Sequence, residues 1–300
     1  MRILIIGSKG FIGTHAIKHF QKQGREVWGS DVMVDYTSER YCLIDSTNAD
    51  FHAIFENIPL DVCINCSGAA SVPDSLNHPL RDYTLNTVNV FKILDAIRQY
   101  QPTCKFINLS SAAVYGNPSV LPIKETSNLY PLSPYGWHKL QAEEICQEFY
   151  SFYKIPTCSL RIFSAYGEGL KKQLFWDLAQ KIQSNSTIKL FGTGEESRDF
   201  IHVSDLIKAI EIIILKSNFK GEKINVANGK EIKIKDIVKC FYSNWDNKIE
   251  YSFSGEERKG DPNNWVADID ILKSMGYTSQ LDIEEGLKKY YEWIIKVEEE

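Results

Sequence analysis

The stretch Met1–Gly13, MRILIIGSKGFIG, decides how the rest of the sequence is interpreted. The apolar run from Arg2 to Ile6 predicts a short buried strand that leads into a turn and then a helix. Gly7, Gly10 and Gly13 follow at intervals of three. Gly7 allows a tight turn, Gly10 lets backbone approach a phosphate, and Gly13 lets the helix pack closely on the strand.

The helix expected after this turn, residues 11–23, favours a dinucleotide site. Unpaired N–H groups at the start of such a helix, at Phe11 and Ile12, face a bound phosphate, and the helix dipole favours negative charge there. The spacing is G-x-x-G-x-x-G and differs from the G-x-G-x-x-G fingerprint of dinucleotide-binding proteins. The stretch therefore resembles that fingerprint in the physical role of each glycine and not in the exact spacing. The alternative is an ordinary strand-turn-helix whose glycines only serve the turn.

Composition limits the class of protein. The 300 residues are 43% hydrophobic and 24% charged, as in soluble globular proteins of one large or two modest domains. The net charge of -5 and the lack of a basic stripe argue against nucleic acid, and no apolar run is long enough to span a membrane. Seven scattered cysteines without a signal peptide indicate reduced thiols in a cytoplasmic protein.

Cys63 and Cys66 form a C-x-x-C, a spacing found in metal and redox sites. The surrounding DVCINCSG, however, predicts a buried strand, in which positions three apart point to opposite faces. We therefore expect no metal site.

The order of elements predicts the fold. Strands are expected at 2–6, 26–30, 40–44, 61–66, 105–110 and 157–162, and helices at 11–23, 51–57, 85–100 and 134–154. This alternation is typical of α/β proteins and predicts a Rossmann-type doubly wound parallel sheet over residues 1–166. The rhythm breaks after Gly167, so we expect residues 167–300 to form a smaller mixed C-terminal substrate lobe, with about 200–227 returning to the main sheet.

Asp31 ends the second expected strand, about 20 residues past the glycine turn, where an acidic side chain hydrogen-bonds the adenosine ribose. A carboxylate there repels the extra phosphate of NADP, so the position favours NAD. The alternative is an aspartate of a strand-end turn.

Tyr135 and Lys139 form a Y-x-x-x-K on one face of the helix expected at 134–154. Tyr150 and Lys154 repeat the pattern, but position separates the two pairs. Tyr135 opens the helix near the carboxyl end of a strand, where open parallel sheets bind ligands. Tyr150 lies 15 residues further, about 22 Å down the helix axis. We interpret Tyr135 as functional and Tyr150 as a packing residue.

A free tyrosine has a pKa of about 10, too high for a base near neutral pH. We expect the ammonium of Lys139, together with a positive nicotinamide ring, to lower the pKa of Tyr135. Tyr135 then removes a proton from a sugar hydroxyl as hydride leaves the same carbon. Ser111, at the end of the preceding strand, is placed to hold that oxygen.

Several further stretches carry a family resemblance over essentially the full chain: GSKGFIG, NCSGAAS, LNTV, SSAAVYG, SPYGWHK, LRIFSAYG and IKLFGTGEESRDFIHVSD. With them the sequence resembles the extended short-chain dehydrogenases/reductases of the NAD-dependent epimerase/dehydratase family, and within it the nucleotide-sugar 4-epimerases. The resemblance implies bound NAD, a nucleotide-diphosphate sugar substrate and a catalytic triad of Ser111, Tyr135 and Lys139. It also implies a homodimer that pairs helices 85–100 and 134–154 into a four-helix contact.

The resemblance assigns further residues to the two ligands. The cofactor contacts that it implies are Gly7, Gly10, Phe11, Ile12, Gly13, Asp31, Asp45, Ser46, Cys66, Ser67, Gly68, Ala69, Asn86, Ser110, Tyr135, Lys139 and Phe163. The substrate contacts are Ser71, Ser111, Tyr135, Ser164, Phe191, Arg198 and Arg258, with the two arginines on the pyrophosphate and Phe191 near the nucleotide base.

Three departures from the family pattern narrow the activity. Ala112 and Ala113 stand where dehydratases have an acid pair, so loss of water is not expected. Ser164 replaces the usual asparagine, and only a short segment joins Asp31 to Asp45. The main hypothesis is a 4-epimerase that recycles its NAD. The alternatives are a nucleotide-linked 4-keto-6-deoxysugar reductase using NADH or NADPH, and a cofactor-sensing module without catalysis.

Overall fold

The computed structural model describes residues 1–184, 188–245, 249–256, 260 and 262–299. Its centre is a seven-stranded sheet in which every pairing is parallel, in the order β11-β6-β5-β4-β1-β2-β3. The strands are β1 (Arg2–Ile6), β2 (Glu26–Asp31), β3 (Tyr41–Leu43), β4 (Val62–Asn65), β5 (Lys105–Ser111), β6 (Thr157–Ile162) and β11 (Lys220–Val226). This confirms the predicted Rossmann-type parallel sheet, of which β11 forms one edge.

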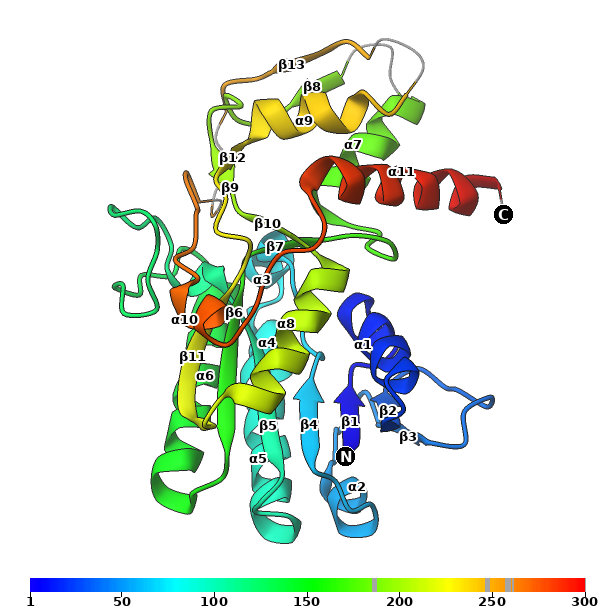
Figure 1. Cartoon of the computed structure of the whole chain (residues 1–300), viewed down its shortest axis with the longest axis vertical. Coiled ribbons are helices and arrows are strands. Elements are labelled where there is room, and N and C mark those ends of the chain that lie inside the picture. Colours follow the sequence, from blue (N-terminus) through cyan, green and yellow to red (C-terminus); the bar gives the residue numbers. More distant parts are fainter. Residues whose placement is uncertain (185–187, 246–248, 257–259, 261, 300) are drawn as a thin grey trace.

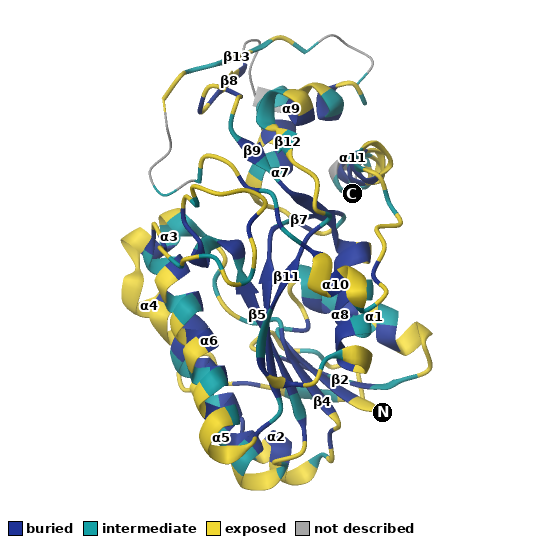
Figure 2. Ribbon diagram, turned by 60° about the vertical axis from the view of Figure 1, so that its left-hand side comes forward, coloured by how far each residue is buried: buried dark blue, intermediate teal, exposed yellow. Residues whose placement is uncertain are grey.

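Helices cover both faces of the sheet (Figures 1 and 2). One face carries α1 (Phe11–Lys22), α8 (Val203–Lys216) and α10 (Asp270–Ser274), over a core built largely of isoleucine, leucine and valine. The other face carries α2 (His52–Asn57), α5 (Asn89–Tyr100) and α6 (Pro134–Tyr153), over a second core. The strands are buried from both sides, which explains their nearly continuous apolar sequence.

The segment before α5 differs from the prediction. A single helix over 85–100 was expected, whereas α3 (Val72–Asn77) and α4 (Pro79–Tyr83) come first and a π-helical turn, Thr84–Val88, leads into α5. Proline at the start of α4 suits a first helical turn, where its missing N–H is not needed. Single π-helical turns often occur at functional sites, and this one contains a predicted cofactor contact, Asn86.

The chain after β6 builds a second layer above the sheet (Figure 1). It holds the helices α7 (Gln173–Ser184), α9 (Ile234–Tyr242) and α11 (Ile283–Glu299), around a third core rich in aromatic rings. Three two-stranded sheets accompany these helices: β7 (Ser164–Tyr166) with β10 (Phe200–His202), β9 (Ser197–Arg198) with β12 (Ile232–Lys233), and β8 (Ile188–Leu190) with β13 (Tyr251–Phe253). The mixed character of the lobe is as predicted.

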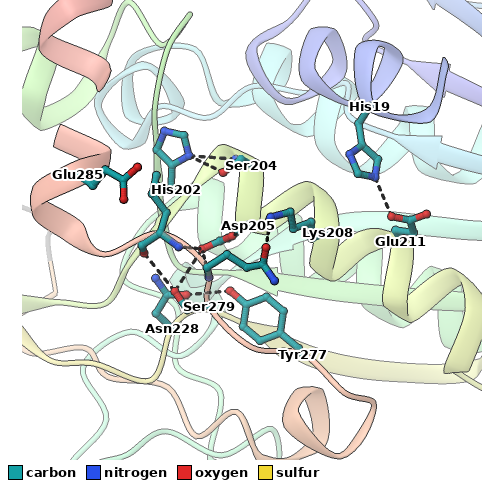
Figure 3. Close-up of polar contacts among 12 residues, drawn as sticks. His19, His202, Ser204, Asp205, Lys208, Glu211, Asn228, Tyr277, Ser279 and Glu285 are labelled. Carbon is teal, nitrogen blue, oxygen red and sulfur yellow. Dashed lines mark hydrogen bonds and ion pairs between the residues drawn. The ribbon is translucent and has the colours of Figure 1, made fainter. Parts of the chain in front are cut away.

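Asp205 on α8 links the two layers (Figure 3). Its buried carboxylate accepts hydrogen bonds from the N–H groups of Gln280 and Leu281, at 3.0 and 3.1 Å, and from the Ser279 hydroxyl at 3.2 Å. These contacts fix the segment that leads into α11. Within the part of the chain described, no helix is long and apolar enough to cross a membrane.

Candidate active site

The turn after β1 has the geometry that its glycines predict. Gly7 has a φ of +79°, and a Cβ on it would lie 2.6 Å from the Ser67 nitrogen. A Cβ on Gly13 would lie 2.1 Å from the Gly7 carbonyl oxygen, so only glycine lets α1 approach this closely. Gly10 is the N-cap of α1 and supplies no capping side chain, which leaves the first N–H groups of the helix for another acceptor.

A cavity of about 730 Å³ runs from this turn across the carboxyl ends of β4, β5 and β6 to the upper lobe. The predicted cofactor residues on its wall are Gly10, Phe11, Ile12, Cys66, Ser67, Gly68, Ala69, Ser110, Tyr135, Lys139 and Phe163. The predicted substrate residues on its wall are Ser71, Ser111, Tyr135, Ser164, Phe191 and Arg198. Residues from segments more than 100 positions apart in the sequence therefore share one cavity.

Other predicted site residues lie outside the wall of this cavity. Gly7 lies in the turn after β1 and Gly13 lies in α1, in close contact with Gly7. Asn86 lies behind Gly68. Asp31 ends β2, while Asp45 and Ser46 follow β3 at the same edge of the sheet. Arg258 lies outside the described residues.

Asp31 joins the end of β2 to the glycine turn. Its carboxylate accepts the Lys9 N–H at 2.9 Å and the Val32 N–H at 2.8 Å. Asp45 accepts the N–H and hydroxyl of Thr47, at 2.7 and 2.6 Å, and these bonds lower the pKa of its carboxyl. Both carboxylates thus lie at the rim of the sheet and accept hydrogen bonds there.

Tyr135 and Lys139 come from the first turns of α6, which Ser133 caps by accepting the Gly136 N–H at 3.2 Å. The Lys139 ammonium is buried, donates to the Leu109 carbonyl at 2.8 Å, and lies 5.9 Å from the centre of the Tyr135 ring. The two side chains of the Y-x-x-x-K therefore face the same wall. Tyr150 contacts Lys154 further along the same helix, away from the cavity.

The electrostatics of this pair correct one expectation. Burial raises the pKa of Tyr135 to about 12, and although a hydrogen bond with Ser111 opposes the rise, Lys139 is not among its causes. Burial also lowers the pKa of Lys139 to about 8, so its own charge is held weakly. The Lys139 ammonium donates to the Leu109 carbonyl, and it does not lower the pKa of Tyr135. The expectation that Lys139 lowers this pKa is therefore wrong for the groups of the protein.

Ser111 is held at the end of β5 by the short 3-10 turn that follows it. Its hydroxyl oxygen accepts the Ala113 N–H at 3.2 Å. The preceding Ser110 donates to Glu143 at 2.6 Å, and Glu143 is fully buried against the Arg161 guanidinium at 2.7 Å. A buried ion pair therefore supports the strand end that presents Ser111.

The far end of the cavity is aromatic and basic. Phe191 lies at its mouth with 56% of its surface exposed, and the Lys181 ammonium is 6.0 Å from its ring centre. Arg198 donates to the Ser197 and Asn263 carbonyls, at 2.8 and 3.2 Å, and its guanidinium lies 5.7 Å from the centre of the Trp265 ring. This end suits a planar base and an anionic group.

The two cysteines of the C-x-x-C are free thiols and form no disulfide with each other. Cys63 is buried in β4, whereas Cys66 follows the strand and borders the cavity. Burial raises the pKa of Cys66 to about 12, so it is a neutral thiol. Among the described residues, no group of three or more histidines, cysteines and acids is placed to hold a metal ion.

Two side chains beside the site were not singled out in the sequence. Asp82 and His138 lie 2.7 Å apart behind Tyr135 and Lys139. His138 stands three residues after Tyr135, a spacing that places both on one helix face. Its partner is 56 positions away, so no local pattern could have found the pair.

Comparison with known proteins agrees with this geometry. A 26% identical structure, the UDP-glucuronic acid 4-epimerase from Bacillus cereus in complex with UDP-glucuronic acid and NAD, superposes with a TM-score of 0.89 over 99% of this chain and 100% of that one. The UDP-N-acetylglucosamine 4-epimerase from Methanobrevibacter ruminantium M1, in complex with UDP-N-acetylmuramic acid, is 27% identical with a TM-score of 0.89, over 99% and 98%.

Sequence comparison extends the likeness. A putative UDP-glucose 4-epimerase from Methanocaldococcus jannaschii is 28% identical over 97% of this chain and 98% of its own length. The model of one protein family, described as the NAD dependent epimerase/dehydratase family, matches residues 3–227. The chain belongs to the NAD-dependent epimerase/dehydratase family.

Proposed function

We propose that the chain is an NAD-dependent nucleotide-sugar 4-epimerase that uses Tyr135 as its proton-transfer group. The observation that carries the proposal is that Tyr135 and Ser111 lie together on the wall of one cavity that also borders Gly10 and Arg198. One ligand reaching from the glycine turn and another reaching from Arg198 would meet at the phenol.

The residues at the glycine turn fit a dinucleotide. Gly10 lies on the cavity wall, and the one atom near the position of a Cβ on it is the Gly7 oxygen at 3.3 Å, so the approach from the cavity side is open among the described residues. The uncapped start of α1 supplies N–H groups for the pyrophosphate, and Asp31 suits the ribose of NAD better than the phosphate of NADP. When bound, NAD supplies a hydride acceptor that can return the hydride.

We assign the roles in the reaction as follows. Tyr135 removes the proton from the sugar 4-hydroxyl while Ser111 holds the same oxygen, and a 4-keto sugar results as the C4 hydride leaves to the NAD that would be bound beside it. After the sugar has turned over, the hydride would return to the opposite face of C4, and Tyr135 returns the proton to the 4-oxygen. Lys139 donates a hydrogen bond to the Leu109 carbonyl and so holds the part of the cavity wall next to the Tyr135 phenol. Because burial raises the pKa of Tyr135, phenolate requires the positive charge of the nicotinamide ring nearby.

We propose a UDP-sugar as substrate, with the base at Phe191 and the pyrophosphate at Arg198 and Arg258. The relatives support this class, since their names include UDP-glucose, UDP-glucuronic acid and UDP-N-acetylglucosamine 4-epimerases. Residues 1–166 would hold the cofactor and residues 167–300 the substrate, with about 200–227 returning to the main sheet. A dehydratase is disfavoured because Ala112 and Ala113 supply no acid pair.

A nucleotide-linked 4-keto-6-deoxysugar reductase remains the second candidate. The observation in its favour is the small adenosine end, where β3 has only three residues. Such an enzyme consumes one reduced cofactor in every turnover, NADH or NADPH, whereas an epimerase consumes none. The two activities are therefore separable by stoichiometry.

The test is to record the absorbance spectrum of the purified protein and then incubate it with UDP-glucose, UDP-glucuronic acid or UDP-N-acetylglucosamine. We expect co-purified NAD and conversion to the 4-epimer without added reductant, followed by chromatography or NMR. An empty protein that instead oxidises added NADH or NADPH with a 4-keto sugar would identify the reductase. Conversion of none of these sugars, with or without reductant, would contradict the proposal.

We also propose a homodimer through α5 and α6. Phe91, Trp137 and Phe152 on these helices are 44%, 51% and 78% exposed, an unusual exposure for large rings. A second copy packing its own α5 and α6 there would form a four-helix contact. Sedimentation should give twice the monomer mass, and a monomer at micromolar concentration would contradict the dimer.

A further inference from the structure

A buried carboxylate lies behind the proposed catalytic residues and takes no part in the reaction described above. Asp82, at the end of α4, is 2% exposed, and its Oδ2 lies 2.7 Å from His138 Nδ1. The same oxygen accepts a hydrogen bond from Asn86 Nδ2 at 2.9 Å. Among the described residues, no hydrogen-bond partner reaches the second oxygen, Oδ1. Burying a carboxylate this deeply costs free energy of folding, which its partners must offset by pairing and hydrogen bonding.

The carboxylate fixes the orientation of the Asn86 amide. Asn86 Nδ2 donates to Asp82 and also to the Ala69 carbonyl at 3.1 Å, so both amide hydrogens are used. The amide oxygen must then point the other way. A Cβ on Gly68 would lie 2.5 Å from this oxygen and 3.5 Å from Lys139 Nζ. Asp82 therefore fixes the direction of the Asn86 amide oxygen. This oxygen is a hydrogen-bond acceptor that lies behind the part of the cavity wall formed by Gly68 and Ala69.

His138, the partner of Asp82, lies on the same face of α6 as Tyr135 and Lys139. Tyr135, His138 and Lys139 stand at positions i, i+3 and i+4 of α6. The Tyr83 ring packs edge-on against the imidazole, with centroids 5.3 Å apart, and the Thr87 hydroxyl donates to the His138 carbonyl at 3.0 Å. Both contacts hold the histidine over Asp82.

The charged groups near this pair are few. On α3 and α4, Asp74 and Arg81 are paired with each other at 2.9 Å. The neutral thiol of Cys66 borders Lys139 from the end of β4. Of the two catalytic side chains, the Glu143 carboxylate of α6 acts on Lys139 alone, so Asp82 is the carboxylate that acts on both. Burial is the main cause of the raised pKa of Tyr135, and the Asp82 charge adds to it; the same charge opposes the lowering of the pKa of Lys139.

We propose that Asp82 and His138 are a positioning pair for the Tyr135–Lys139 site. The carboxylate orients Asn86 behind the cofactor wall. The imidazole donates its Nδ1–H to Asp82, since a carboxylate can only accept, and this hydrogen bond reduces the carboxylate charge felt by the phenol. The inference rests on the proposed function, because it assigns the pair to the site of that reaction.

Asp82 and His138 are expected to change the pKa of the Tyr135 phenol in opposite directions. A general loss of structure in the variants would not give shifts of opposite sign, so the sign of each shift is the test. NAD⁺ carries a positive ring and favours phenolate, so its affinity should begin to increase at the pH where Tyr135 titrates in the NAD⁺ complex, below the pKa of about 12 of the free protein. Asp82→Asn removes a negative charge and should move this midpoint of the titration in the complex down by about 0.5–1 pH unit. His138→Gln removes the imidazole donor that reduces the Asp82 charge and should move it up. Asp82→Asn should also weaken NAD⁺ binding several-fold, because the Asn86 amide is no longer held in one orientation.

The experiment measures the dissociation constant of NAD⁺ between pH 6 and 10, by quenching of tryptophan fluorescence in protein freed of bound nucleotide. A matched control exists in the chain: His19 and Glu211 form another histidine–carboxylate pair, 2.8 Å apart, between α1 and α8 (Figure 3). His19→Gln and Glu211→Gln should leave the midpoint unchanged, and Tyr135→Phe should abolish the pH-dependent rise.

Opposite shifts in Asp82→Asn and His138→Gln support the inference. Unchanged midpoints, or shifts in the same direction, overturn it. Circular dichroism and urea unfolding confirm folding, and if Asp82→Asn does not fold, the upward shift or its absence in His138→Gln decides alone. Measuring NAD⁺ binding requires no turnover. If the epimerase assay fails while the NAD⁺ titration gives the expected shifts, the proposed function is contradicted but the role of the Asp82–His138 pair is not.

Discussion

A Cβ on Gly13 would lie 2.1 Å from the carbonyl oxygen of Gly7, so the first helix contacts the first strand through backbone alone. This contact brings the start of α1 to the edge of the cavity.

Gly13→Ala should therefore destabilise the protein, although alanine is the better helix former by about 1 kcal/mol. The clash is with backbone that cannot move aside, and we expect a loss of about 2–3 kcal/mol in the free energy of unfolding, measured with urea. Gly10→Ala is the matched control, because its methyl would point into the cavity. It should leave stability within about 1 kcal/mol of wild type and weaken NAD⁺ binding. Equal losses of stability in both variants would contradict this division.

Asp31→Ser should reduce the preference for NAD over NADP. The carboxylate lies at the end of β2, where it repels a 2′-phosphate, and serine removes the repulsion but keeps a hydroxyl group. Dissociation constants for NADH and NADPH, measured by nucleotide fluorescence, should approach each other by tenfold or more, about 1.4 kcal/mol. A ratio that stays at the wild-type value would show that Asp31 does not select the cofactor.

Glu143→Gln should cost about 3–5 kcal/mol, because it leaves the Arg161 charge unpaired in the core. Both side chains are 3% exposed or less. The matched control is Asp95→Asn, which breaks the partly exposed pair with Arg98 and should cost less than about 1 kcal/mol. Urea unfolding checks both. A small loss in Glu143→Gln would mean that water or another group compensates Arg161.

Glu168→Gln should destabilise the protein in a pH-dependent way. The His202 imidazole, with Nε2 3.0 Å from the carboxylate, lowers the pKa of Glu168 to about 2. A carboxyl whose pKa falls on folding stabilises the fold above its unfolded pKa of about 4.3, and this stabilisation disappears as pH falls toward 2. The difference between wild type and variant should be on the order of 1–3 kcal/mol at pH 6 and much smaller at pH 3. A difference that grows on acidification would contradict this sign.

The sequence predicted those parts of the molecule that local rules determine. The strand, turn and helix around Gly7 follow from apolar periodicity and from glycine, and the structure has them within one residue at each end. The position of Tyr135 at the start of α6 was likewise predictable, because Ser133 and Pro134 are typical of a helix start.

Other features depend on contacts between distant segments. The strands of two or three residues, such as β9 and β12, exist only because residue 198 pairs with residue 232. Lys139 faces the Leu109 carbonyl and Asp82 meets His138 for the same reason. Burial, which neither motif nor spacing reveals, reverses the expected pKa shift of Tyr135.

The central claim is that the Tyr135 phenol transfers the proton at the sugar carbon that exchanges hydride. Its most direct test is the turnover of Tyr135→Phe against Tyr150→Phe, with the NAD⁺ dissociation constant of each measured at the same pH. We predict that Tyr135→Phe lowers kcat by about 10²–10⁴-fold with NAD⁺ binding near wild type, because only the proton transfer is lost, while Tyr150→Phe stays within about twofold. Near-normal turnover in Tyr135→Phe, or a large loss in Tyr150→Phe instead, would contradict the claim.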